Sequence, residues 1–162
     1  MGSEMCIRDR LNTDKLGLES DTYVYIWTTT PWTLPSNMAI AVGSEIDYCA
    51  VATEANELAI VAKNRLEQYF PEDVQIVSEF KGSKLLGLEY QQFFPYFEEE
   101  RANNAFKIYP GDSFVTDEDG TGLVHMASFG EDDLTVFQAN NITVIDPVDE
   151  DGKFEALSLI HI

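Results

Sequence analysis

Short runs of β-branched and aromatic residues recur along this chain, with turn residues such as Gly, Asn, Asp and Pro between them. Runs of this kind predict β-strands. We expect strands at residues 21–30, 38–42, 47–53, 57–62, 74–80, 106–109, 114–116, 123–127 and 143–147, and a short extended segment at 84–90.

Two stretches show helical spacing instead. Residues 63–70 form a short apolar face and end at Pro71, and residues 131–141 carry Leu134 and Phe137 inward. Three consecutive acids occupy the first turn of the second helix, where they suit the positive end of the helix dipole. Many short strands with one or two short helices predict a mainly β, β-barrel-like domain.

The first predicted strand leads into an unusually polar turn. Residues 23–27 are apolar at both alternating positions, so we expect this strand to be buried on both faces. Pro31 and Pro35 lack N–H donors, so the strand cannot continue regularly through them. The turn carries five hydroxyls and a carboxamide, from Thr28, Thr29, Thr30, Thr33, Ser36 and Asn37. These groups either line a pocket or bond the nearby backbone, and the pattern leaves both interpretations open.

One histidine, His125, lies inside the predicted strand at 123–127, where it either packs in the core or serves a site. A zinc site is not indicated, because the only other histidine is His161 and no cysteine pair is present near either. A Cys–His nucleophile pair would require Cys49 beside His125, and nothing in the sequence places them together. Asp133 has an ordinary explanation as an acid at a helix start.

Other site signatures are absent from the sequence. The acidic turns at 117–120 and 149–152 lack the full ligand pattern of a calcium loop, so they are interpreted as turns. Neither a phosphate-binding Walker loop nor the glycine fingerprint of a dinucleotide-binding fold occurs.

The composition limits the partners of the chain. Its 162 residues carry a formal net charge of −19, which argues against broad, non-specific RNA binding through a basic face. The acidic surface either keeps the protein soluble or reflects a salt-adapted host. No apolar run reaches the roughly 18 residues of a membrane span. The scarcity of cysteine fits a reducing compartment, and we expect a cytoplasmic location without a membrane partner.

Both ends of the chain match the translation of a DNA-library adapter. Residues 157–162 are encoded by CTG-TCT-CTT-ATA-CAC-ATC, the end of a transposon adapter, and the reverse complement encodes residues 5–9 and opens the Arg10 codon. We therefore interpret residues 1–10 and 157–162 as non-native segments and residues 11–156 as the domain, an internal fragment of a larger protein.

Two long motifs occur in a fixed order. The first is the threonine-rich turn at 27–37. The second is Gly-Thr-Gly-Leu-Val-His-Met-Ala at 120–127, followed by Phe-Gly-Glu-Asp-Asp at 129–133. Together they resemble the editing domain of isoleucyl-tRNA synthetases, the insert called connective polypeptide 1. Segments 79–83 and 93–97 match in kind and order, so the resemblance runs from about residue 21 to residue 154. Two such motifs are more specific than one short pattern.

The resemblance implies the synthetase editing fold and a hydrolase that removes valine wrongly esterified to isoleucine tRNA. It implies catalytic roles for a set of hydroxyls and one carboxylate, those of Thr28, Thr29, Thr30 and Asp133. The hydroxyls would hold the terminal ribose, the ester carbonyl and the attacking water, and the carboxylate would hold the substrate ammonium. Substrate-binding roles are implied for Trp27, Thr33, Asn37, His125 and Asp132, with the bulk of His125 limiting the side chain that enters.

Editing requires no cofactor and no metal. The parent synthetase would use ATP and Mg²⁺, but the HIGH-type and KMSKS-type ATP signatures are absent from this chain. The implied partners are the 3′ end of charged tRNA(Ile) and the rest of the synthetase.

Two alternatives stay open: the editing domain of a valyl- or leucyl-type enzyme, and an inactive module that binds aminoacyl-tRNA. The valine and leucine enzymes usually show Thr-Thr-Arg-Pro where this chain has Thr29-Thr30-Pro31, which favours the isoleucine branch. The family usually reads His-x-Ala-Pro-x-Phe-Gly, and this chain has one residue fewer between Ala127 and Phe129. One residue spans at most about 3.3–3.6 Å, enough for an uncompensated deletion to move Asp133 away from the substrate ammonium. Loops often absorb a single deletion, so we expect Asp133 still to face the pocket, with Asp132 as the next candidate.

Overall fold

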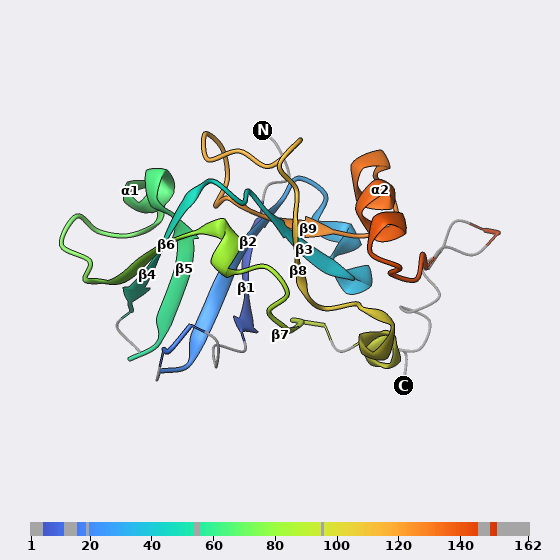
Figure 1. Ribbon diagram of the computed structural model, residues 1–162, viewed down its shortest axis with the longest axis horizontal. Coiled ribbons are helices and arrows are strands. Elements are labelled where there is room, and N and C mark those ends of the chain that lie inside the picture. Colours follow the sequence, from blue (N-terminus) through green and yellow to red (C-terminus); the bar gives the residue numbers. More distant parts are fainter. Residues whose placement is uncertain are drawn as a thin grey trace.

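The structure is a computed structural model that describes residues 5–11, 16–18, 20–53, 56–94, 96–145 and 150–151, with only the backbone described at 5–10. Its strands are β1 (Met5–Leu11), β2 (Thr22–Thr28), β3 (Ala39–Val42), β4 (Asp47–Ala52), β5 (Leu58–Ala62), β6 (Ile76–Lys81), β7 (Tyr90–Gln91), β8 (Ile108–Pro110) and β9 (Leu123–Met126). Its helices are α1 (Leu66–Tyr69), α2 (Glu131–Ala139) and the 3₁₀ helices η1 (Pro31–Ser36), η2 (Lys63–Arg65), η3 (Gly82–Lys84) and η4 (Glu98–Asn103). The prediction of a mainly β fold with a few short helices is confirmed (Figure 1).

The strands form one mixed sheet that forks at β2. One edge of β2 pairs antiparallel with β1, and the other pairs in parallel with β5 near its start and with β9 at Trp27. Strands β4 and β6 extend the sheet beyond β5, and β3 and β8 extend it beyond β9. Strand β9 therefore lies between β2 and β3, which are neighbours in the sequence.

The second branch of the sheet curls round into a barrel-like body. Beyond β8, the Tyr90 N–H donates to the Phe106 carbonyl over 3.1 Å, and Glu89 forms a bridge with Lys107. Strand β7 then pairs with β1, which returns to β2. Residues 1–10 are interpreted from the sequence as non-native, and their backbone at 5–10 lies in this ring as part of β1.

The main core fills this curved sheet. Its largest fully buried side chains come from many different strands and from α2, and include Tyr48, Tyr90, Phe106, Phe137, Ile26, Met38 and Ile40. A smaller apolar cluster on the other side of β4 and β5 contains Cys49 and Val61 and is covered by Tyr25 and Phe70. Helix α1 lies at the end of the sheet formed by β4–β6, and α2 lies at the opposite end beside β9 and β3 (Figure 1).

The first predicted strand is buried differently from the expectation. Strand β2 alternates between buried and half-buried positions, so only the face with Val24 and Ile26 is fully enclosed. The other face carries Tyr25, whose ring lies 5.3 Å from that of Phe70. The aromatic residues that made both faces look interior are large enough to remain partly exposed at the smaller cluster.

Three predicted extended segments were wrong in the residues described. Residues 82–84 form η3, and Leu85 and Leu88 are buried from turns in place of the extended segment expected at 84–90. Residues 114–116 follow a turn in which the N–H groups of Phe114 and Val115 both bond the Gly111 carbonyl. Residues 143–145 are irregular, and 146–147 lie outside the described residues.

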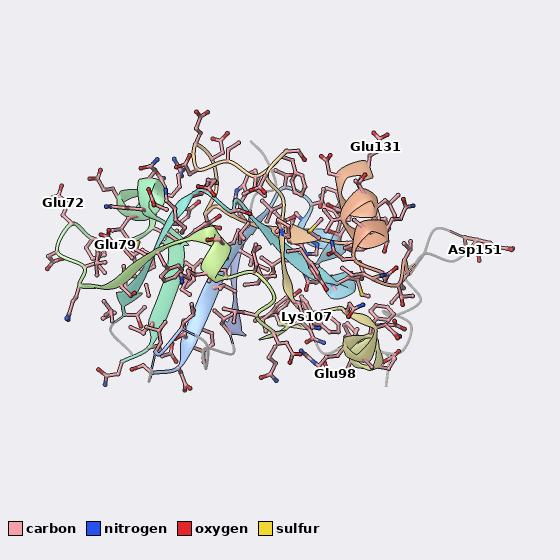
Figure 2. The ribbon with its side chains drawn as sticks, in the orientation of Figure 1. Glu72, Glu79, Glu98, Lys107, Glu131 and Asp151 are labelled. Atoms are coloured by element: carbon pink, nitrogen blue, oxygen red, sulfur yellow. The ribbon has the colours of Figure 1, made fainter. Side chains whose placement is uncertain are left out.

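Acidic side chains are spread around the molecule. Figure 2 shows Glu72 and Glu79 near the α1–β6 end, Glu131 at the start of α2, Glu98 at η4 and Asp151 at the far end. The labelled acidic residues therefore do not gather on one face of the molecule.

Candidate active site

A pocket opens where the ends of β2 and β9 meet α2. Its volume is about 380 Å³, and its lining comes from three segments of the chain: Thr30, Trp32 and Thr33, then His125 and Ala127, then Phe129, Gly130 and Asp133. Volumes of roughly 300–1,000 Å³ are usual for small-molecule sites. Segments far apart in the sequence therefore enclose a space suited to a small substrate.

The threonine-rich turn forms one wall because proline ends the strand. Pro31 begins η1 directly after β2, so the chain coils there and does not continue the sheet. The Thr33 hydroxyl donates to the Thr30 carbonyl over 2.8 Å, and its oxygen lies 3.1 Å from the Thr30 hydroxyl. The Ser36 hydroxyl donates to the Thr33 carbonyl in the same way. These side chains thus stabilise the turn, and Thr30 and Thr33 also face the pocket.

His125 is held at both of its ring nitrogens. Nε2 lies 2.9 Å from the Thr33 hydroxyl, and Nδ1 lies 2.7 Å from Asn37 Nδ2. The same Asn37 nitrogen donates to the Ala39 carbonyl over 3.0 Å, which identifies it as the amide nitrogen because a carbonyl only accepts. His125 Nδ1 therefore accepts from Asn37, and Nε2 carries the ring hydrogen.

Burial keeps His125 neutral. Desolvation lowers its pKa from 6.5 to about 4, and a hydrogen bond with Thr33 opposes the shift only in part. A proton on Nδ1 would also face an N–H of Asn37, a contact between two donors. Because both nitrogens already have partners in the protein, His125 is suited to be a wall of the pocket and not a general base.

Asp133 brings the carboxylate of the site. It lies in the first turn of α2, and its Oδ2 accepts the backbone N–H of Ala127 over 3.2 Å. Burial raises its pKa from 3.8 to about 6, and the nearby charge of Asp132 acts in the same direction. Hydrogen bonds from the backbone of Ala127 and Gly130 oppose the rise. At pH 7 the carboxylate is mainly ionised and partly removed from water, a good site for a cation.

The other residues singled out from the sequence lie around this pocket in different ways. Thr28 is buried and its hydroxyl accepts the Thr30 N–H over 3.0 Å, so it supports the turn from behind. Asn37 is buried behind His125. Thr29 and Asp132 are exposed and do not line the pocket. The structure thus brings together Thr30, Thr33, His125 and Asp133, with Thr28 and Asn37 as their supports.

Trp27 does not line the pocket. Its ring covers Gly120, where an added Cβ would come within 2.5 Å of the indole. Gly120 and Gly122 have φ angles of +62° and +81°, a conformation that glycine adopts readily, so the glycines of this motif shape the loop before β9.

The sequence is similar to isoleucine–tRNA ligases. The chain is 42% identical over 158 residues to the enzyme of Treponema denticola and 44% identical over 145 residues to that of Bdellovibrio bacteriovorus. Each alignment covers 86% of this chain and 14% of the relative, so the chain spans about 14% of the length of these curated relatives. A scan against models of known protein families finds no match.

Solved structures with the same fold are editing domains of a related synthetase. The crystal structure of GlLeuRS-CP1 superposes with a TM-score of 0.69 at 18% identity, covering 83% of this chain and 58% of that one. The cytosolic leucyl-tRNA synthetase editing domain of P. knowlesi gives a TM-score of 0.64 at 15% identity, covering 86% and 64%. The chain is an isoleucyl-tRNA synthetase segment with the editing-domain fold. The resemblance stated from the two motifs is thereby confirmed.

This editing domain accommodates its shortened loop. With one residue fewer than the usual motif between Ala127 and Phe129, the chain turns tightly, and the Phe129 N–H bonds the Ala127 carbonyl over 2.9 Å. Asp133 lines the same pocket as His125 and Thr30. The one-residue difference therefore does not move Asp133 to the outer surface.

Several pocket residues of the editing domain were not foreseen from the sequence. Trp32 is 58% exposed and Phe129 is 45% exposed, although both line the pocket. Trp32 and Phe129 each lie inside one of the two motifs. An aromatic residue in a motif of otherwise mainly polar or small residues was the sequence feature that could have indicated their place in the pocket. Ala127 and Gly130 offer no chemical signal of their own. Tyr90, which bonds Asn37 without lining the pocket, lies far away in the sequence.

The described part of the editing domain shows neither a metal-binding cluster nor a membrane-spanning helix. Within the described part of the chain, no group of three or more His, Cys, Asp or Glu residues is placed to hold a metal ion. None of the helices described has the length and apolar character needed to cross a bilayer.

Proposed function

We propose that this domain performs post-transfer editing: it hydrolyses the ester of valine wrongly attached to tRNA(Ile), as part of an isoleucine–tRNA ligase. One observation carries the proposal. A buried histidine and a partly buried carboxylate line the same pocket as Thr30 and Thr33, in a chain whose sequence is similar to isoleucine–tRNA ligases.

Editing answers a physical limit of the synthetic site. One methylene changes binding in an apolar pocket by only about 1–3 kcal/mol, a general figure whose usual worked example is isoleucyl-tRNA synthetase itself. A second pocket can reverse the selection by admitting valine and excluding the larger isoleucine. His125 suits this steric role because hydrogen bonds at both ring nitrogens fix the plane of the ring.

The polar groups suit the ester end of the substrate. The ionised Asp133 carboxylate would bind the α-ammonium group, a charge-assisted contact worth about 1.5–3 kcal/mol. The Thr30 hydroxyl, supported by Thr28 and Thr33, would bond the ester carbonyl or the attacking water. The roles for Thr29, Trp27 and Asp132 stay sequence predictions, since these residues lie away from the lining.

The reaction is the attack of water on the ester carbonyl carbon. The bond from that carbon to the ribose oxygen breaks, one proton of the water passes to the ribose oxygen, and the amino acid leaves as a carboxylate with the second proton released to solvent. No redox step is involved, so editing itself requires no cofactor; ATP and Mg²⁺ would serve aminoacylation elsewhere in the parent enzyme.

The partners follow from this reaction. The pocket would receive only the 3′ end of charged tRNA(Ile), in the cytoplasm, and the rest of the synthetase would hold the remainder of the tRNA. The net charge of −19 supports this division, because an acidic domain repels a second, broad RNA contact.

The test is deacylation of tRNA(Ile) charged with valine or with isoleucine. The chain is assayed by itself and in place of the matching segment of the Bdellovibrio bacteriovorus enzyme. We expect loss of the valyl ester and survival of the isoleucyl ester. Absence of hydrolysis in both forms would contradict the proposal and favour an inactive module. Faster hydrolysis of mischarged tRNA(Val) or tRNA(Leu) would assign the domain to one of those branches.

A further inference from the structure

A chain of buried hydrogen bonds runs behind the pocket and starts at Tyr90. The Tyr90 hydroxyl donates to Asn37 Oδ1, and Asn37 Nδ2 donates to His125 Nδ1 over 2.7 Å. His125 Nε2 then donates to the Thr33 hydroxyl over 2.9 Å, which donates to the Thr30 carbonyl over 2.8 Å. Tyr90, Asn37, His125 and Thr33 are exposed by 2%, 5%, 6% and 6% respectively.

The direction of every bond in this network is determined by its ends. The carbonyls of Ala39 and Thr30 can only accept, so Asn37 presents its nitrogen to Ala39 and Thr33 gives its hydrogen to Thr30. The remaining Asn37 atom, Oδ1, then requires a donor, and the Tyr90 hydroxyl supplies one. At Nδ1, the histidine tautomer is therefore set by Asn37, Ala39 and Tyr90, which lie outside the pocket lining.

Tyr90 is mounted on a well-supported part of the barrel. Its N–H bonds the Phe106 carbonyl, and its own carbonyl accepts from Arg101 over 3.0 Å. Its ring meets the edge of the Phe106 ring at 89° with centroids 6.2 Å apart. A hydroxyl on such a support can hold a neighbour in one orientation, as supporting residues around functional groups generally do.

We propose that Tyr90 is a positioning residue of the pocket: its hydroxyl fixes the Asn37 carboxamide, which in turn fixes the tautomer and ring plane of His125. The consequence for substrate selection rests on the proposed editing function, whereas the effect on the histidine does not. Without the hydroxyl, Asn37 Oδ1 loses this donor in a buried place, and the carboxamide gains freedom to turn. The His125 ring would then lose its defined partner at Nδ1.

The direct test is the ¹⁵N NMR signal of the imidazole in this chain and in Tyr90→Phe. The chain has two histidines, so His161→Gln identifies the signal of His125. In the parent chain we expect hydrogen on Nε2 alone at pH 7. In Tyr90→Phe we expect a mixture of tautomers and a His125 pKa closer to 6.5. Asp133 is the other ionisable residue in the pocket lining, so its titration could affect the His125 signal. The imidazole signal is therefore also measured in Asp133→Asn.

Tyr109→Phe is the matched control. Tyr109 also donates its hydroxyl to a protein oxygen, the Asn104 carbonyl, and neither partner of this bond is a member of the Asn37–His125 network. It should leave the His125 signal unchanged. An unchanged tautomer and pKa of His125 in a folded Tyr90→Phe would overturn the proposal.

A second substitution covers the case in which Tyr90→Phe does not fold. Replacing Tyr90 by 3-fluorotyrosine keeps the shape of the residue and makes its hydroxyl a stronger donor. The His125 Nδ1 resonance should then shift through Asn37, and an unshifted resonance would overturn the proposal. Asn37→Asp should have a larger effect in the same network, because a carboxylate accepts a hydrogen from Nδ1 and so raises the His125 pKa.

The functional readout is the ratio of kcat/KM for the valyl and isoleucyl esters. Tyr90→Phe should lower this ratio by about ten-fold, because a mobile histidine wall excludes the extra methylene less well. KM for tRNA should change little, since Tyr90 does not line the pocket. If the parent chain hydrolyses neither ester, the editing proposal fails, and the NMR result still decides the role of Tyr90.

Discussion

The backbone N–H of Ala127 donates to the carboxylate of Asp133 over 3.2 Å, which ties the end of β9 to the first turn of α2. This bond spans the loop that is one residue shorter than the usual motif. It holds the Asp133 carboxylate in the lining of the pocket to which His125 also belongs. The site of this domain therefore depends on a backbone contact as much as on the identity of its side chains.

Asp133→Asn should separate substrate binding from stability. The amide keeps an oxygen for the Ala127 N–H but removes the charge that would hold the substrate ammonium. We expect kcat/KM for the valyl ester to fall about 10- to 100-fold, corresponding to about 1.5–3 kcal/mol. Thermal unfolding at pH 7 should show no loss of stability, because a partly buried charge has been removed. Unchanged deacylation by a folded variant would contradict the role of Asp133.

His125→Ala should relax selection by size. Removing the imidazole enlarges the pocket next to Ala127, so the isoleucyl ester should now enter and be hydrolysed. The measurement is deacylation of both charged tRNA(Ile) species by the same preparation, with Tyr109→Phe as a control outside the network. A variant that folds and still spares the isoleucyl ester would show that another residue sets the size limit.

The histidine also predicts how stability depends on pH. Burial lowers the folded-state pKa of His125 from 6.5 to about 4, so between these values the unfolded chain binds more protons than the folded one. The free energy of unfolding should therefore fall as pH drops from 6.5 to 4, by about 3 kcal/mol from this residue. Urea unfolding at a series of pH values checks this, and His125→Gln should lack that part of the dependence.

Asp133 acts in the opposite direction over nearly the same range. Its pKa is raised from 3.8 to about 6, so the folded chain binds the extra proton and gains relative stability as pH falls. The Asp133→Asn variant should accordingly lose stability more steeply on acidification than the parent chain. An identical slope in the two proteins would mean that the carboxyl titrates alike in the folded and unfolded states.

The threonine tract should divide into different roles when each residue is replaced by valine. Thr28→Val leaves the Thr30 N–H without its acceptor and should cost about 1–3 kcal/mol of stability. Thr30→Val should lower hydrolysis most, because Thr30 lines the pocket, and the exposed Thr29 should have the smallest effect. Replacement of all three should reduce hydrolysis by orders of magnitude. Equal activity in a folded triple variant would make the tract purely structural.

Much of the strand pattern was predictable because local composition and burial agree. Strands β4 and β5 lie where alternating or continuous apolar runs indicated them, and Pro71 follows the short helix α1 as expected. The strand predicted at 114–116 was wrong although Phe114 and Val115 are good strand formers. Their N–H groups bond the Gly111 carbonyl in a turn, and their side chains pack against the core. Local propensity cannot reveal such an override.

The site was predictable only in part for a similar reason. The motifs pointed to Thr30, Thr33, His125 and Asp133, whose side chains carry recognisable chemistry. The contribution of Tyr90 depends on β7 lying behind η1, and no local pattern connects it with Asn37, 53 positions away. Residues that act through another side chain become visible only when the fold brings them together.

The insertion of β9 between β2 and β3 has a consequence for how this domain is made. The two strands that flank β9 are synthesised before it: β3 ends at Val42, whereas β9 begins only at Leu123. Until residues 123–126 emerge, both strands present unsatisfied edges, and a chain in this state is prone to associate with other chains. The same late strand carries His125, so the pocket and the protection of these edges arise in a single step. A nascent chain arrested before β9 should therefore be a chaperone client with no pocket at all.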